Sequence, residues 1–127
     1  MPRLTFNKNE RLCSRKAIEE LYSNGRSFYC PNLKVIFLPQ KEIALHPCQV
    51  VFSAPKKSFK RAVDRNLIKR RMREAYRLNK PAFYEQLNNK KIYLHVLFLY
   101  NSKEIFSFEE ISRNMQQALA ELLKKAG

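Results

Sequence analysis

The sequence predicts an α+β domain in which helices pack on a small sheet, with elements in the order αβββαβα. Two observations carry this prediction. A basic segment over residues 62–78 has good helix formers and neither Gly nor Pro, which indicates a long helix. Residues 91–100 are almost continuously apolar and rich in β-favouring side chains, which is typical of a strand buried on both faces.

The remaining elements follow from capping residues and breaks. A first helix is predicted over 14–24, with Ser14 as N-cap and Gly25 in the left-handed conformation after its end. Strands are predicted at 27–30, 33–38 and 48–54, and Asn79-Lys80-Pro81 is expected to end the basic helix. A capping box at Ser107 opens the last helix. Residues 1–10 are expected to be a mobile, basic lead-in.

Composition indicates a polyanionic partner. The chain has 127 residues, which suits one domain over 1–127, and its 25 Lys and Arg outweigh 11 Asp and Glu to give a net charge of +14. Nucleic acid is favoured over a membrane, because no apolar run approaches the roughly 20 residues that span a bilayer. Since the first residues do not look like a signal peptide, a cytoplasmic location is expected.

Neither a metal site nor a catalytic group is predicted. The three cysteines are far apart and form no Cys-x-x-Cys pair, which argues against a disulfide framework and a zinc site. We expect them to be reduced and mostly buried. His46 and His95 have no neighbouring Cys, Asp or Glu in the pattern of a metal site or a triad, so both are interpreted as structural.

The strongest pattern is a cationic face on the predicted long helix. Ten of the 22 positions from 56 to 77 carry Lys or Arg. The helical period places most of the charges of 65–77 within roughly 60° of Asn66, while Ile68, Met72 and Ala75 fall on the opposite side. Like charges this close together favour binding to a polyanion. The cationic face, with its leading loop, comprises Lys56, Lys57, Lys60, Arg61, Arg65, Asn66, Lys69, Arg70, Arg73 and Arg77.

This segment closely resembles the signature of the bacterial ribonuclease P protein component. The matching residues are Lys56-Lys57, Ala62-Val63-Asp64-Arg65-Asn66, Lys69-Arg70 and Arg73-Glu74-Ala75-Tyr76-Arg77. Arg11-Leu12 and Gly25-Arg26 also fall where that family has them. The sequence departs from the family at Leu67, where the usual residue is Arg, and at Ser58-Phe59-Lys60-Arg61, where many members have a Gly.

The resemblance implies a fold and a function. Such proteins bind a catalytic RNA and assist it in removing the 5′ leader of precursor tRNA, and the RNA carries the active site with its Mg²⁺ ions. The cationic face would then bind RNA. The implied fold is a single domain with a small, mostly antiparallel sheet and a left-handed crossover into the last strand, whereas elementary chain geometry favours a right-handed one.

The resemblance also implies a cleft for the unpaired leader. By position in the family pattern, Ile18 and Tyr22 on the first helix and Phe37 on the long strand would line it, with Phe52 as a further candidate. Apolar and aromatic side chains beside positive charge suit unpaired bases. Core packing remains the alternative for each aromatic side chain.

Two other functions fit the composition. A non-catalytic basic RNA-binding protein, such as a ribosomal protein or an RNA chaperone, would share the charge and the lack of catalytic groups. A self-sufficient nuclease is a third possibility. The ordered motif from Lys56 to Arg77 favours the ribonuclease P component, because generic basic proteins need not contain it.

Overall fold

A computed structural model describes residues 10–41 and 46–126 of the chain. The order of its elements is the predicted one. The expectation for residues 1–9 lies outside the described residues. The elements are α1 (Arg15–Asn24), β1 (Arg26–Cys30), β2 (Leu33–Gln40), β3 (Cys48–Ser53), α2 (Ala62–Lys90), β4 (Tyr93–Tyr100) and α3 (Phe108–Ala126).

The four strands form one mixed sheet in the order β1-β2-β4-β3. The β1–β2 and β2–β4 pairs are antiparallel and the β3–β4 pair is parallel, which confirms a mostly antiparallel sheet. Helix α2 connects the two parallel neighbours, so it is the crossover to which the expectation of a left-handed connection applies. That handedness stays a prediction.

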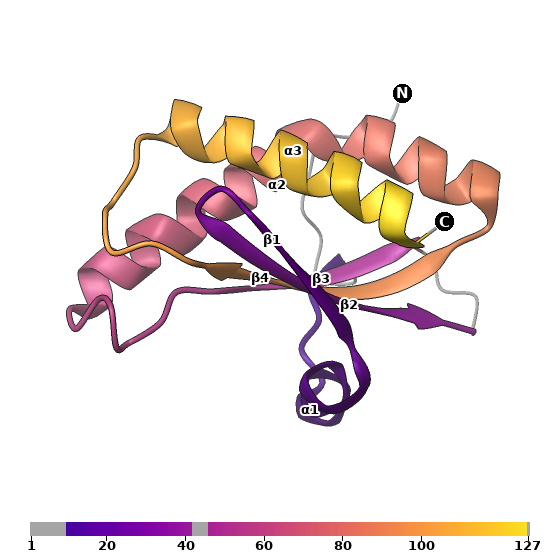
Figure 1. The fold of residues 1–127 in the computed structure, drawn as a ribbon, viewed down its shortest axis with the longest axis horizontal. Helices are drawn as coiled ribbons and strands as arrows, with labels where there is room; N and C mark the ends of the chain where they lie inside the picture. Colours follow the sequence, from indigo (N-terminus) through magenta and orange to yellow (C-terminus); the bar gives the residue numbers. More distant parts are fainter. Residues whose placement is uncertain (1–9, 42–45, 127) are drawn as a thin grey trace.

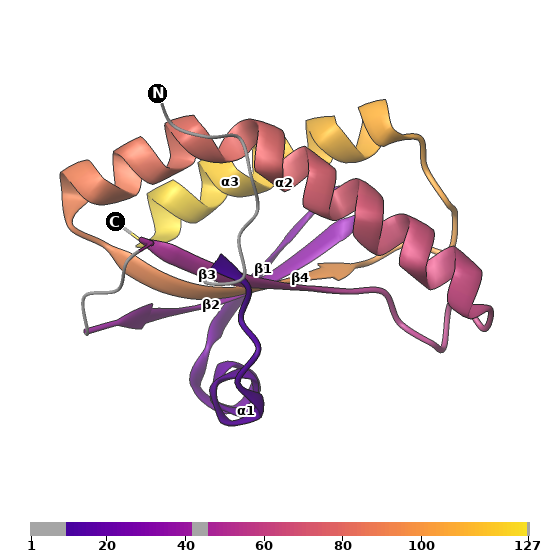
Figure 2. The same cartoon turned by 180° about the vertical axis from the view of Figure 1, so that it is seen from behind.

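Helices cover the two faces of the sheet unequally. Helices α2 and α3 lie on one face and α1 alone lies on the other (Figures 1 and 2). The main core lies beneath α2 and α3, and a smaller cluster of Leu12, Leu21, Ile36 and Leu97 lies beneath α1. Strand β4 is buried on both sides, as predicted, because Phe98 joins the main core and Leu97 joins the smaller cluster.

The ends of α1 confirm one expectation and correct another. The Ser14 hydroxyl oxygen accepts a hydrogen bond from the Ala17 N–H at 3.2 Å, as an N-cap should. Gly25, however, is extended, with φ −71° and ψ 153°, and not left-handed. A Cβ at this position would lie 2.3 Å from the Leu21 carbonyl oxygen and 2.8 Å from Cγ2 of Ile36. The backbone at Gly25 thus lies so close to α1 and β2 that there is no room for a side chain.

Helix α2 does not end before Pro81, so that prediction was wrong. The helix continues to Lys90 with Pro81 inside it, and Figure 1 shows a bend partway along its length. A proline in a helix interior costs about 3 kcal/mol. The turns beyond it bury Phe83 and Leu87, and burial of one such side chain contributes about 1.5–3 kcal/mol. Tertiary burial thus offsets the lost backbone hydrogen bond.

The strands alternate strictly between the two faces. On β2, Leu33, Val35 and Phe37 face the main core, while Ile36 and Leu38 face α1. On β3, Val50 and Phe52 face the main core and Val51 faces α1. We call the surface that carries Ile36, Leu38 and Val51 the α1-side face. None of the helices among the described residues is long and apolar enough to cross a membrane.

Candidate nucleic-acid interface

The cationic face lies on α2 and the loop before it, where the sequence predicted it. Ile68, Met72 and Ala75 are buried against the main core on the other side of the helix, as the helical period predicted. Lys56, Lys57, Lys60 and Arg61 are exposed before the helix. On the helix itself, Asn66, Arg70 and Arg73 are exposed, whereas Arg65, Lys69 and Arg77 are half-buried.

Two of the predicted arginines are engaged within the protein. One terminal nitrogen of Arg65 donates to the carbonyl oxygens of Phe59 at 2.7 Å and Lys60 at 3.0 Å. These bonds fold the loop back onto the first turn of α2. Arg77 binds the carboxylate of Glu74, with its Nε 3.1 Å from Oε2, and this contact lowers the pKa of the Glu74 carboxyl. Both are therefore less available to an external anion than the sequence suggested.

The cations in the middle of α2 remain available to bind an external anion. Within residues 10–41 and 46–126, no salt bridge engages Lys69, Arg70 or Arg73. These three side chains occupy adjacent turns, so their like charges repel at close range. An arginine can hold two phosphate oxygens at once through its planar fork. Lys69, Arg70 and Arg73 are thus the best placed to bind a polyanion.

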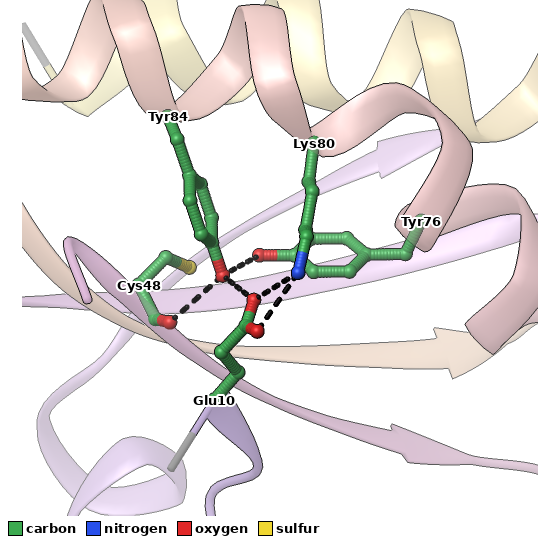
Figure 3. A network of polar contacts seen from close by, with 5 residues as sticks. All are labelled: Glu10, Cys48, Tyr76, Lys80 and Tyr84. Atoms are coloured by element: carbon green, nitrogen blue, oxygen red, sulfur yellow. Dashed lines mark hydrogen bonds and ion pairs between the residues drawn. The ribbon is translucent and has the colours of Figure 1, made fainter. Parts of the chain in front are cut away.

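The segment before α1 is fixed against β3 and α2, which the sequence analysis missed. Both Glu10 carboxylate oxygens accept from Lys80 Nζ, at 2.8 and 2.6 Å, and the Tyr84 hydroxyl donates to Glu10 Oε2 at 2.6 Å (Figure 3). The side chains of Glu10 and Lys80 are only 1% and 7% exposed. Burial and the neighbouring Cys48 raise the pKa of Tyr84. The next residues then pair with β3, since the Leu12 N–H donates to the Val50 carbonyl at 2.8 Å.

This anchored segment forms one wall of a groove that reaches the cationic face. The groove has a volume of about 240 Å³. It brings Lys69 and Arg73 of α2 beside apolar side chains of the N-terminal segment and β3. We call it the β3–α2 groove. Its lining residues are Arg11, Leu12, Cys13, Val50, Val51, Phe52, Lys69 and Arg73.

The predicted leader-cleft residues divide into two pairs. Tyr22 is 59% exposed on α1, and Ile18 is half-buried against the cluster beneath α1. Phe37 is only 1% exposed and packs edge-on against Phe28 in the main core, so its predicted place in the cleft is wrong. Phe52 is 9% exposed, and although it borders the β3–α2 groove, its ring is stacked on Phe98 in the same core. Neither ring is available to stack on a base.

Polar residues in the strands mark the more open face of the sheet. Because side chains alternate, a shift of one residue moves a whole set to the other face. Lys34 is the polar residue of the run 33–38, and it marks Ile36 and Leu38 as its neighbours on the more open face. On β3, Gln49 and Ser53 mark Val51 in the same way. The two faces of these strands are thus distinguished by their polar residues in the sequence itself.

The two histidines line a separate cavity, and the three cysteines are free thiols. His46 and His95 both line a cavity of about 330 Å³ at the N-terminal end of β4, and burial lowers the pKa of His95. In the described part of the chain, no group of three or more His, Cys, Asp or Glu could hold a metal ion. Cys48 is buried, but Cys13 is exposed, which corrects the expectation of mostly buried thiols.

The chain is similar in sequence to known proteins over most of its length. A model of the Ribonuclease P family matches residues 6–125. The chain is 36% identical over 118 residues to the ribonuclease P protein component of Porphyromonas gingivalis, covering 93% of this chain and 86% of that protein. It is 33% identical over 118 residues to that of Chlorobaculum tepidum, covering 86% and 77%.

The fold is shared with a solved structure. The structure of the Staphylococcus aureus RNase P protein aligns with a TM-score of 0.72 at 20% identity, covering 94% of this chain and 100% of that one. The order of elements and the mixed sheet described above are thus those of a known RNase P protein structure. The family model spans nearly the whole chain. This chain belongs to the family of ribonuclease P protein components.

Proposed function

We propose that this chain is the subunit of a ribonuclease P holoenzyme that binds the catalytic RNA and the 5′ leader of precursor tRNA. In this role it assists the endonucleolytic cut that produces the mature 5′ end. One observation carries the proposal most directly: the β3–α2 groove brings Lys69 and Arg73 beside the apolar surface of Leu12 and Val51. Cations beside apolar surface are what unpaired RNA requires.

The catalytic RNA would bind the exposed part of the cationic face. A folded RNA presents closely spaced phosphates, and each phosphate bound by Lys or Arg releases condensed counterions. Arg70 and Arg73 are suited to bidentate phosphate contacts. Asn66 can both donate and accept hydrogen bonds towards a ribose or base. Leu67, where the family usually has Arg, would remove one ionic contact without removing this surface.

The leader would lie along the β3–α2 groove and the α1-side face. Ile18 and Tyr22 remain candidates from the family pattern. Leu38 and Val51 replace Phe37 and Phe52, because they are the half-buried strand residues on that face. The Tyr22 ring is exposed enough to stack on a base.

The protein has no assigned catalytic side chain in this proposal. Mg²⁺, bound mainly by the RNA, would supply the hydrolytic chemistry. This assignment rests on the family resemblance. The protein's part is to bind and orient the two RNAs, and the cytoplasm remains the expected location.

A processing assay tests the proposal. Purified protein and the catalytic RNA of the same organism are incubated with precursor tRNA, together and separately, over a Mg²⁺ series. Leader removal at low Mg²⁺ only when both are present is expected. Processing by protein alone would indicate a self-sufficient nuclease. An unchanged Mg²⁺ requirement on adding protein would favour a general RNA-binding protein.

Salt dependence tests the cationic face itself. Arg73→Ala should weaken assembly with the catalytic RNA and lower the log–log slope of affinity against salt by about 0.7–0.9, the value of one phosphate contact. The matched control is Arg113→Ala on α3, where the arginine binds Glu110 and lies outside the cationic face. If the two variants have the same slope, Arg73 does not contact phosphate.

A further inference from the structure

A row of side chains crosses the whole sheet on the side where α1 lies. Tyr29 on β1 stands opposite Lys34 on β2, Lys34 stands opposite Leu99 on β4, and Leu99 stands opposite Ser53 on β3. Residues directly opposite one another point to the same face. Ile36, two positions from Lys34, packs beneath α1, so this row belongs to the α1-side face.

The β1 end of the row is open and carries an aromatic side chain beside a cation. Tyr29 is 67% exposed, and the Lys34 ammonium lies 5.4 Å from the centre of its ring. Helix α1 packs over the neighbouring row of Ile36 and Leu97, so it leaves this end uncovered. A single exposed tyrosine would need no functional explanation by itself. The position of Tyr29 on this face, beside a lysine, indicates a functional role for its ring.

The other end of the row leads to the cationic loop. Ser53 is the last residue of β3, and Lys56 and Lys57 follow in the exposed turn. None of the four strands contains Asp or Glu, so the row has no acidic residue to repel a phosphate. Strands lie about 4.8 Å apart, which makes the row roughly 14 Å long. An extended strand of RNA could follow it from the β3–α2 groove to β1.

We propose that Tyr29 and Lys34 form an additional leader subsite, in which an unpaired base stacks on the Tyr29 ring and its phosphate lies beside the Lys34 ammonium. This inference rests on the proposed function. With the catalytic RNA on the cationic face of α2, the β3–α2 groove takes the leader nucleotides nearest the cleavage site. Tyr29 is at the opposite edge of the sheet, so the base that it holds lies further along the leader. Only leaders long enough to cross the sheet reach it.

The test is a leader-length series with the assembled holoenzyme. Affinity is measured for mature tRNA and for precursors with leaders of increasing length. Tyr29→Ala should weaken binding of long-leader precursors about tenfold, as expected for the loss of one base–aromatic stack, and leave mature tRNA and short leaders unchanged. Tyr29→Phe should bind like the native protein, and Lys34→Gln should reduce the salt dependence for long leaders only.

The controls separate this subsite from other roles. Ile105→Ala removes an exposed apolar side chain in the loop between β4 and α3 and should change no affinity. Equal weakening of all tRNAs by Tyr29→Ala would show contact with the catalytic RNA or a structural role, and no weakening would show that leaders do not reach β1. Both results overturn the subsite. If the native holoenzyme binds precursor and mature tRNA equally, the leader role in the proposed function fails instead.

Discussion

The buried ion pair between Glu10 and Lys80 anchors the N-terminal segment, and removing one partner should strongly destabilise the protein. In Lys80→Met the apolar part of the side chain is kept and the ammonium is lost. The Glu10 carboxylate, 1% exposed, then keeps the hydrogen bond from the Tyr84 hydroxyl but loses both contacts with the Lys80 ammonium. Removing one partner of a buried ion pair is the costly outcome.

The expected loss can be set against the stability of the whole domain. Breaking a buried pair by removing one partner costs about 3–5 kcal/mol. A domain of this kind has a free energy of unfolding of about 5–15 kcal/mol, so the change would remove a large part of it. With a urea m-value of about 2 kcal/mol/M, the midpoint of unfolding should fall by about 2 M.

Urea unfolding followed by far-UV circular dichroism measures this effect. The control is Lys124→Met, which removes a lysine from an exposed pair with Glu121 and should cost less than about 1 kcal/mol. The double variant Glu10→Leu/Lys80→Met should cost less than Lys80→Met alone, because no unpaired charge remains. If Lys80→Met is no more costly than Lys124→Met, the pair with Glu10 is solvated and stabilises the protein no more than an exposed pair does.

Three further predictions concern other closely packed positions. Phe37→Ala should lower the free energy of unfolding by about 3–5 kcal/mol without changing the preference for precursor over mature tRNA, and a selective loss of precursor binding would return Phe37 to the cleft. Gly25→Ala should cost about 1–3 kcal/mol in the same urea assay, since its Cβ would clash with the Leu21 carbonyl, and a neutral result would contradict the close packing there. Burial raises the pKa of the Cys48 thiol from 9.0 to about 12, so only the unfolded chain loses this proton between those values. The contribution of this thiol to the free energy of unfolding should therefore be constant below about pH 9 and fall as the pH rises towards 12. Cys48→Ala should make this fall shallower. If the variant and the native protein lose stability equally over this pH range, the Cys48 thiol does not contribute to the fall.

Local patterns predicted the elements and the cationic face well. The 3.6-residue period separated Ile68, Met72 and Ala75 from the charged side of α2, and the capping role of Ser14 needed only its neighbours. The end of α2 could not be found in this way. A proline normally favours termination, and only the burial of Phe83 and Leu87 against other elements reverses that preference.

The leader-cleft residues show a different limit. The run 33–38 is apolar at almost every position, so hydrophobicity alone does not say which side chains face α1 and which face α2 and α3. Lys34 is polar, so it indicates which set of side chains lies on the more open face. This indication can be interpreted only once two helices are known to cover one face of the sheet and a single helix the other. Glu10 was missed because its partners, Lys80 and Tyr84, are about 70 residues away along the chain.

The sequence alone determined the charge, the order of the elements and the family motif, because these depend on residue types and on periods of a few residues. The tertiary structure decided which arginines remain available, which strand face is open and where the N-terminal segment is held. Those properties depend on contacts between residues distant in the chain, such as Glu10 with Lys80 and Leu12 with Val50. No local pattern encodes a partner on another element, so only the folded arrangement places the apolar groove beside Lys69 and Arg73.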